Sequence, residues 1–307
     1  MPITENTFFY SHQLSNEDYH ADPAIGSSGL KKFMECPALY YAHYINPKGK
    51  ENRPKSDALT FGSQAHLKLL EPDVFEESFM VSEEFSVLKS GENKGASVPM
   101  NKAHASYKSF AAECRKAGKE PLLHSDFEML CEMAAMLKND PLINACFTGV
   151  GQNECSFFAK DEITGLVMKS RPDRVVNLQG VGGYKYIIID YKTTAGDLGD
   201  VAQEQIKRRE KRHLQAASHI APIEGIMNIK IDAVIYICQS KEYPYLARAF
   251  ELDPGDIEIG NDERRNALDG YTDHKGIYHK GLSECAKDGI WPSYSGITKY
   301  QRLRDYV

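Results

Sequence analysis

The chain has 307 residues, 42% of them hydrophobic and 26% charged, and its 37 Lys and Arg against 43 Asp and Glu give a net charge of −6. That composition predicts a globular protein with a sizeable core and argues against disorder beyond the two ends. The sequence contains no run of 18 apolar residues, and residues 1–6 lack the basic start and apolar core of a signal peptide. We therefore expect a cytoplasmic protein with no membrane partner.

Apolar residues at helical spacing predict helices in the first half of the chain, at 27–46, 57–71, 101–118 and 124–138. Ser27 or Ser28 is the expected cap of the first helix, and the second is expected to end before Pro72. The polar, glycine-bearing stretch 85–99 predicts a mobile loop that could approach a ligand. We interpret the apolar positions of the last two helices as a packing layer over a sheet.

Beyond Asp140-Pro141 the pattern changes to β-branched and aromatic runs that alternate with helical stretches. The expected elements are strands 153–160, 166–178 and 185–192, a helix at 200–220, strands 231–240 and 245–251, and a helix around 254–269. This order is a β-meander, a crossover helix and further strands, which predicts an α/β fold with a mixed central sheet flanked by helices.

The most informative motif is Arg171-Pro172-Asp173, followed after 16 residues by Asp190-Tyr191-Lys192. The run Tyr186 to Lys192 reads as a buried strand whose period of two places Asp190 and Lys192 on one face. Glycines 180, 182 and 183 supply a turn, so the preceding strand folds back and brings Asp173 beside Asp190.

Two carboxylates are the usual protein ligands of magnesium, which prefers oxygen donors. A lysine beside such an ion can orient or deprotonate an attacking water and offset charge during the cleavage of a phosphodiester. The alternative is that Asp190 and Lys192 form an ordinary ion pair at a strand end and that Asp173 is a turn residue. A bare D-x-K pattern leaves both interpretations open.

Together with further segments, this pattern resembles the PD-(D/E)xK nuclease superfamily, and within it the RecE-like exodeoxyribonuclease VIII family and its RecB-like relatives. Pro172-Asp173 matches the PD element, and Asp190-Tyr191-Lys192 matches the D-x-K element. The further segments are 27–41 as the opening helix, 61–67 as a histidine motif, 153–158, 192–194, 213–217 and 291–294. The resemblance covers roughly residues 20 to 296. It implies a restriction-endonuclease-like core.

The resemblance adds three residues to the site, namely His66, Glu154 and Gln215. It implies that His66 and Glu154 join Asp173 and Asp190 as metal ligands, and that Gln215 bonds Lys192 or a DNA phosphate. By residue type alone, His66 would be a core histidine, and Glu154 and Gln215 would lie on the surface. One departure is His219, which stands where the family's Q-x-x-x-Y motif has tyrosine.

Nucleic-acid enzymes usually carry a basic surface, so the net charge of −6 is an objection to a nuclease. The run 207–213 partly answers it, because it places five positive charges just before Gln215. We expect Lys207, Arg208, Lys211 and Arg212 to bind DNA phosphates. The alternative is a solvated helix face.

Seven cysteines, at positions 36, 114, 131, 146, 155, 238 and 285, form no C-x-x-C pair. They argue against a zinc ribbon or a disulfide framework, and we interpret them as packing residues. Related RecB-like nucleases with an iron–sulfur cluster group three cysteines near the C-terminus, where this chain has only Cys285. We therefore expect no iron–sulfur cluster, and a cofactor of Mg²⁺, with Mn²⁺ as an alternative.

The resemblance implies an exodeoxyribonuclease that degrades linear double-stranded DNA from its ends, in the 5′ to 3′ direction, and leaves 3′ single-stranded tails. It also implies a homo-oligomeric ring and a RecT-type annealing partner in a phage or prophage recombination system. We expect an N-terminal extension at 1–26, one nuclease domain at 27–296 and a tail at 297–307. Within the domain, 27–150 is mainly helical and 151–270 is the catalytic core. Two alternatives stay open: a RecB-like single-strand nuclease of repair or CRISPR adaptation, and an inert DNA-binding module.

Overall fold

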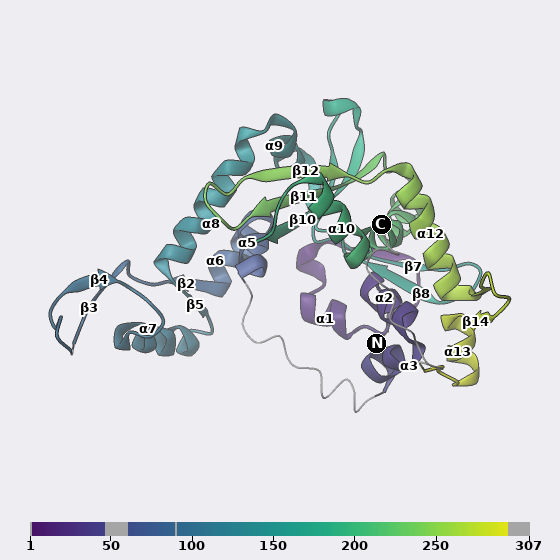
Figure 1. Ribbon diagram of the computed structural model, residues 1–307, viewed down its shortest axis with the longest axis horizontal. Coiled ribbons are helices and arrows are strands. Elements are labelled where there is room, and N and C mark those ends of the chain that lie inside the picture. The colour runs from purple at the N-terminus through teal and green to yellow at the C-terminus, as the bar shows by residue number, and fades with distance from the viewer. Residues whose placement is uncertain (1, 47–60, 90, 294–307) are drawn as a thin grey trace.

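A five-stranded mixed sheet forms the centre of the computed structural model, which describes residues 2–46, 61–89 and 91–293 (Figure 1). In sheet order its strands are β12 (Ala247–Glu251), β11 (Ala233–Ser240), β10 (Tyr186–Thr194), β9 (Arg174–Asn177) and β6 (Val150–Asn153). β10 and β11 are parallel, whereas the other neighbours are antiparallel. Helices lie on both faces of this sheet. The predicted α/β class with a mixed central sheet is confirmed.

The period of two along β10 divides its side chains between two hydrophobic cores. Ile187 and Ile189 pack against helices α5 (Phe61–Leu70), α6 (Pro72–Ser78), α8 (His124–Met136) and α9 (Pro141–Thr148). Ile188 faces the other way, toward α11 (Arg212–Met227) and α12 (Pro254–Asp269). Asp190 and Lys192 therefore lie on the face that α11 covers.

The chain passes between the central sheet and a smaller one at two points, and one of the predicted strands is broken there. The predicted strand 153–160 corresponds to β7 (Ser156–Lys160), and β6 before it was not predicted, whereas the predicted strand 166–178 is divided into β8 (Val167–Ser170) and β9. β7 and β8 pair with each other and with β1 (Thr7–Phe9) in a three-stranded sheet. The expectation of one continuous strand at 166–178 was wrong, because the chain changes sheets between β8 and β9, and it also changes sheets between β6 and β7.

The N-terminal helices are also shorter than predicted. The expected helix at 27–46 consists of α2 (Ser27–Glu35), α3 (Pro37–Tyr40) and a π-helical turn at Tyr41–Ile45, and it follows α1 (Asn16–Ala21). α2 ends because Cys36 is extended, at φ −168° and ψ 120°, as the residue before a proline prefers. The N-cap is Gly26, not Ser27 or Ser28. Of the predicted helix at 57–71, residues 57–60 lie outside the described part.

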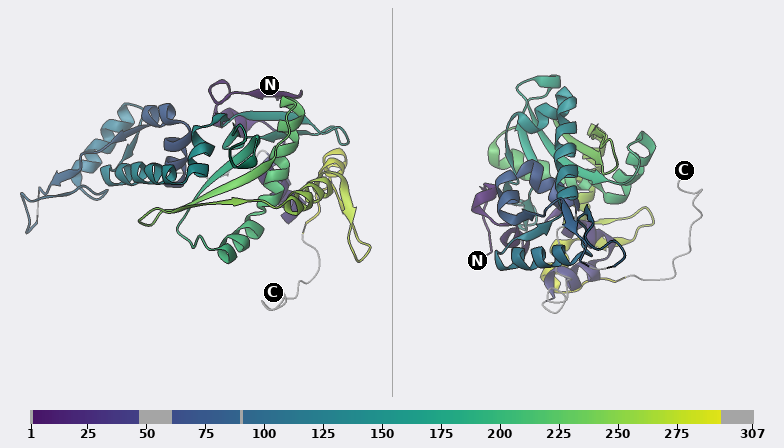
Figure 2. Two further views of the ribbon diagram at one scale, coloured as in Figure 1. Left: turned by 90° about the horizontal axis from the view of Figure 1, so that it is seen from above. Right: turned by 90° about the vertical axis from the view of Figure 1, so that its left-hand side faces the viewer.

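An arm projects from one end of the molecule (Figures 1 and 2). It contains the pair β2 (Phe79–Val81) and β5 (Glu120–Leu122), the hairpin β3 (Phe85–Val87) and β4 (Ser97–Pro99), and α7 (Ala105–Lys116). The stretch predicted as a loop thus begins and ends in strands, and Leu88 and Ala96 continue the hairpin through a 3.0 Å backbone bond. Ser90 lies outside the described residues.

The helix predicted at 200–220 is two helices, α10 (Asp200–Glu210) and α11, because Lys211 adopts a left-handed conformation with φ 49°. Together they connect β10 to its parallel neighbour β11. The chain ends its described part with the hairpin β13 (Gly270–Thr272) and β14 (Tyr278–Lys280), and then α13 (Leu282–Asp288). No helix among the described residues has the length and apolar character needed to span a bilayer. The domain boundaries proposed above stay a prediction.

Candidate active site

The two sheet-switching points meet at one corner of the structure, where Glu154 and Asp173 lie side by side. Glu154 follows β6 and has a left-handed backbone, with φ 51°, and its N–H donates to the Asp173 carbonyl at 3.1 Å. Asp173 directly precedes β9. Pro172 has no N–H to donate to a neighbouring strand, which favours the start of β9 after this point. A non-glycine residue at positive φ costs about 1 kcal/mol and is typical of functional sites. The strand breaks therefore create the corner that holds both carboxylates.

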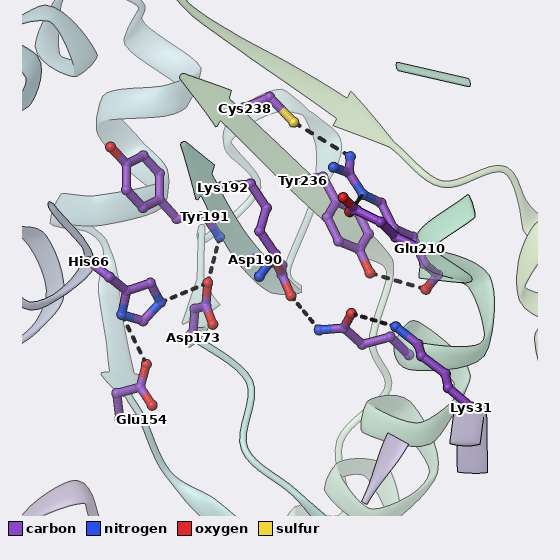
Figure 3. A network of polar contacts seen from close by, with 12 residues as sticks. Lys31, His66, Glu154, Asp173, Asp190, Tyr191, Lys192, Glu210, Tyr236 and Cys238 are labelled. Carbon is purple, nitrogen blue, oxygen red and sulfur yellow. Dashed lines mark hydrogen bonds and ion pairs between the residues drawn. The ribbon is translucent and has the colours of Figure 1, made fainter. Parts of the chain in front are cut away.

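His66, on α5, completes a group of three residues at this corner (Figure 3). Its Nε2 lies 3.0 Å from Asp173 Oδ2, and its Nδ1 lies 3.5 Å from Glu154 Oε1. One potential ligand atom from each of the three residues lies within 4.8 Å of the other two. One imidazole nitrogen and two carboxylate oxygens are donors that divalent cations accept, so this group has the composition of a cation site.

The pKa values of these three side chains are shifted because the side chains are buried and lie close together. Burial and the neighbouring Asp173 carboxylate raise the pKa of Glu154 to about 8. Burial opposes the charge of His66, but Asp173 and Glu154 outweigh it and raise the pKa of that imidazole to about 9. Burial likewise opposes the charge of Asp173, yet Lys192 and His66 lower its pKa to about 2. At neutral pH Asp173 is therefore the ionised carboxylate of the group, and a bound cation would have to displace the protons from Glu154 and His66.

Asp190 and Lys192 form a second group beside the first (Figure 3). Lys192 Nζ lies 2.5 Å from Asp190 Oδ1, and Gln215 on α11 donates to Asp190 Oδ2 at 2.7 Å. Lys31 on α2 in turn donates to the Gln215 side chain at 3.3 Å. The structure leaves Asp190 outside the three-residue group, although the sequence predicts it as a metal ligand. Gln215 contacts Asp190 here, not Lys192.

The two groups are joined through the backbone of β10. Tyr191, between Asp190 and Lys192, donates its N–H to Asp173 Oδ2 at 2.6 Å. Burial opposes the charge of Lys192, but the carboxylates of Asp190 and Asp173 raise the pKa of its amine above the usual range. In this state the side chain is an ammonium ion that donates hydrogen bonds and cannot accept a proton. The arrangement favours charge stabilisation by Lys192 over deprotonation of water.

The four basic residues predicted to bind DNA differ in their exposure and in their partners. Arg208 is exposed, with 74% of its side chain accessible, whereas Lys207 bonds Asp256 and Lys211 bonds Glu263, both on α12. Arg212 is buried, with 6% of its side chain accessible. A direct phosphate contact by Arg212 does not agree with that burial. These pairings to α12 depend on the fold, so the sequence alone did not reveal them.

Arg212 instead packs against β11, the strand next to the one that carries Asp190 and Lys192. Its guanidinium is stacked over the Tyr236 ring at 4.8 Å and donates to Cys238 Sγ at 3.5 Å. Its charge is among those that favour the ionised form of Asp190, although burial has the larger, opposite effect and raises the pKa of that carboxyl. Arg212 thus supports β11, the parallel neighbour of the strand β10 that carries Asp190 and Lys192.

Sequence reasoning did not assign roles to two further residues, Lys31 and Arg171. Burial lowers the pKa of Lys31 to about 8. Arg171 stacks over Tyr19 and donates to Ser156 and to the Leu14 carbonyl, which ties the N-terminal segment to the corner. The sequence did contain a clue to each of these two residues. Lys31 lies in the segment that resembles the opening helix, and Arg171 directly precedes Pro172-Asp173.

An open groove of about 720 Å³ gives access to the site. His66, Glu154 and Lys192 line it, together with Glu71 and Arg171. Its size and its mixture of charged and apolar walls suit a polar chain-like ligand. The fold and this site define a domain of the PD-(D/E)xK type, with a restriction-endonuclease-like core.

Comparison with known families identifies the group to which the chain belongs. The family described as a PDDEXK-like domain of unknown function (DUF3799) matches residues 26–303. Because the match spans most of the sequence, the chain belongs to this family. Membership of this family supports a nuclease function for the chain, and PD-(D/E)xK nucleases typically depend on a divalent metal.

The chain is also similar to a solved structure, the crystal structure of a candidate exonuclease from Eubacterium rectale. The identity is 13%, the alignment covers 96% of this chain and 98% of that chain, and the TM-score is 0.49. A search of curated proteins finds no match.

Proposed function

We propose that this protein is a divalent-cation-dependent exodeoxyribonuclease that degrades linear double-stranded DNA. The observation that carries the proposal is the convergence of His66, Glu154 and Asp173 within 4.8 Å, directly beside the Asp190–Lys192 pair. Membership of a PDDEXK-like family supports the same reaction class. The preference for double strands and for ends rests on the resemblance to RecE-like enzymes.

The chain's own residues divide the work between the two groups. His66, Glu154 and Asp173 would hold the cation, whose chemistry is to lower the pKa of a bound water and to stabilise charge on phosphate oxygens. Lys192 supplies a fixed ammonium group for the negative charge that develops during cleavage. Gln215 fixes the Asp190 carboxylate, and through it the position of Lys192.

Further features of the proposal rest on the resemblance alone. They are the 5′ to 3′ direction, the 3′ single-stranded tails, a homo-oligomeric ring around the DNA and cooperation with a RecT-type annealing protein in phage or prophage recombination. The same resemblance suggests Mg²⁺ as the cation. The imidazole of His66 is compatible with Mn²⁺ as well, so both ions belong in the test.

The decisive experiment incubates the purified protein with Mg²⁺ or Mn²⁺ and four substrates: linear duplexes labelled at the 5′ or the 3′ end, a closed circular duplex and a labelled single strand. We expect early loss of the 5′ label and an intact circle. Cleavage of the circle would indicate an endonuclease, and a preference for the single strand would favour a RecB-like activity. Binding without cleavage under either ion would refute the proposal and favour an inert module.

A further inference from the structure

The side chain of Lys31 on α2 points inward, toward α11. Leu30 and Phe33 on the same helix are buried in one core cluster with Leu214 of α11. Because Gln215 follows Leu214 directly, this packing brings Lys31 and Gln215 together, and Lys31 Nζ donates to Gln215 Oε1 at 3.3 Å (Figure 3). Lysine usually keeps its amine in solvent, since the burial of an ammonium ion is costly. The half-buried Lys31 is therefore an exception that its neighbours must explain.

The charges around Lys31 leave its amine mainly protonated at neutral pH. Burial lowers the pKa of this amine to about 8, and the cations of Lys192 and Arg212 act in the same direction. The carboxylates of Asp190 and Glu210 oppose that change. An ammonium group has three N–H donors and no acceptor, so Lys31 can only donate hydrogen bonds.

The side-chain amide of Gln215 lies between two neighbours of opposite kind. On one side is the Lys31 ammonium, a donor, and on the other is the Asp190 carboxylate, an acceptor that pairs with Lys192. The oxygen and the NH2 end of an amide have nearly the same shape, so sterically each end could face either neighbour. Only one orientation makes both hydrogen bonds, with Oε1 toward Lys31 and Nε2 toward Asp190. The ammonium group of Lys31 therefore selects the orientation of the Gln215 amide.

The orientation of this amide determines how the Asp190 carboxylate is held. Oδ2 of Asp190 accepts from Gln215 at 2.7 Å, and Oδ1 lies 2.5 Å from Lys192 Nζ. Only 3% of the Asp190 side chain is accessible, so water is a poor substitute for either donor. A reversed amide would place its oxygen against Oδ2, and the repulsion would turn the carboxylate and displace the ammonium group of Lys192. The chain of bonds from Lys31 thus ends at the group that is proposed to stabilise charge during cleavage.

We propose that Lys31 is a positioning residue for cleavage, which fixes the Gln215 amide and, through the Asp190 carboxylate, the ammonium group of Lys192. Among the described residues that line the active-site groove, Lys31 is absent, so it acts through Gln215 and not on the substrate. The inference rests on the proposed function, because the role of Lys192 in charge stabilisation gives the chain of bonds its purpose. It adds α2, from the N-terminal part of the sequence, to the elements on which the rate of cleavage depends.

Two substitutions at Lys31 and one at its neighbour separate the positioning role from general effects. Lys31→Met removes the ammonium group and keeps a long, unbranched side chain that suits a helix; since a half-buried charge is lost, we expect this variant to fold. Lys31→Arg keeps a cation that can only donate. The matched control is Lys32→Met, which removes the same charge from the next residue of α2, where the ammonium group bonds Glu35 at 2.6 Å in a more exposed pair.

The first measurement is cleavage of a linear duplex near neutral pH, together with the Kd for DNA in EDTA. We expect Lys31→Met to lower kcat about tenfold, as the loss of one hydrogen bond to a charged group does, with Kd changed less than about twofold. Lys31→Arg should recover most of the rate, and Lys32→Met should match the wild type. An unchanged kcat in Lys31→Met, an equal loss in Lys32→Met, or a change in Kd alone would overturn the inference.

A double-mutant cycle with Gln215 tests whether Lys31 acts through the amide. Gln215→Leu removes the amide, so Lys31→Met should cause no further loss of kcat in that background. Gln215→Glu keeps the shape and an oxygen for Lys31 but loses the donor to Asp190, and its kcat should fall as far as that of Gln215→Leu. If Lys31→Met causes the same loss in the wild type and in Gln215→Leu, or if Gln215→Glu has wild-type kcat, the inference is wrong.

A measurement without cleavage separates this inference from the proposed function. The side-chain NH2 group of Gln215 gives a nitrogen-15 NMR signal that is assigned by its absence in Gln215→Leu. In the metal-free protein we expect Lys31→Met to shift this signal, whereas Lys31→Arg and Lys32→Met leave it close to its wild-type position. An unshifted signal in Lys31→Met would overturn the inference even in an active nuclease. A shifted signal in a protein that cuts no DNA would support the fixed amide and refute the proposed function.

Discussion

The substitution Gly260→Ala tests how closely helices α11 and α12 approach each other where they cross. A Cβ at Gly260 would lie 2.2 Å from the His213 carbonyl oxygen and 3.1 Å from Ala217 Cβ. The clashing atom is backbone, so the two helices must separate. Overpacking costs about 3 kcal/mol at the upper end of its usual range, while alanine gains about 1 kcal/mol over glycine in a helix. We expect a net loss of about 2 kcal/mol in the free energy of unfolding.

The matched control is Gly225→Ala in α11, where a new Cβ would meet no heavy atom of the described residues within 4 Å. The same substitution should here stabilise the protein by roughly 0.5–1 kcal/mol, because only the helix propensity changes. Urea denaturation followed by circular dichroism measures both variants. If Gly260→Ala is as stable as the wild type, or if both variants shift in the same direction, the helices do not approach each other as described.

Three further predictions concern the candidate site. Asp173→Ala should reduce DNA cleavage by several powers of ten in a steady-state assay while circular dichroism and DNA binding stay unchanged, and near wild-type activity would contradict the ligand assignment. Lys192→Gln should lower kcat with little change in Kd for DNA, because we expect its ammonium group to act in the transition state, and a change in Kd alone would indicate substrate positioning. Replacing Lys207, Arg208 and Lys211 by alanine should flatten the dependence of log affinity on log salt by about 0.9 for each phosphate that is no longer bound, and an unchanged slope would identify these residues as structural.

The sequence predicted the elements whose pattern is local. The run of β-branched residues around Ile188 indicated β10, and a period of two placed Asp190 and Lys192 on one face, as the structure has them. The Pro72 position predicted where α5 ends. In each case a residue's neighbours along the chain determine the outcome, so no knowledge of the fold was needed.

The features that the sequence could not predict are tertiary. A positive φ at Glu154 has no signal in its side chain, because glutamate rarely adopts that conformation, and the passage of two strands into a second sheet depends on β1 pairing from the far end of the chain. The sequence suggested that the basic residues at 207–212 are free to bind phosphate. Their acidic partners, such as Asp256, come from α12, about 50 residues later in sequence. The burial of Arg212 was hidden for the same reason.

The three-stranded sheet gives the active-site corner a weakness of its own. Glu154 and Asp173 lie at the junctions of this sheet with the central one, and the strained backbone at Glu154 persists only while both sheets hold it. The smaller sheet is closed by β1, an edge strand of three residues, and short edge elements open before a global core does. On gentle heating, the corner should lose its geometry while the central sheet is still folded, so that inactivation precedes melting and reverses on cooling.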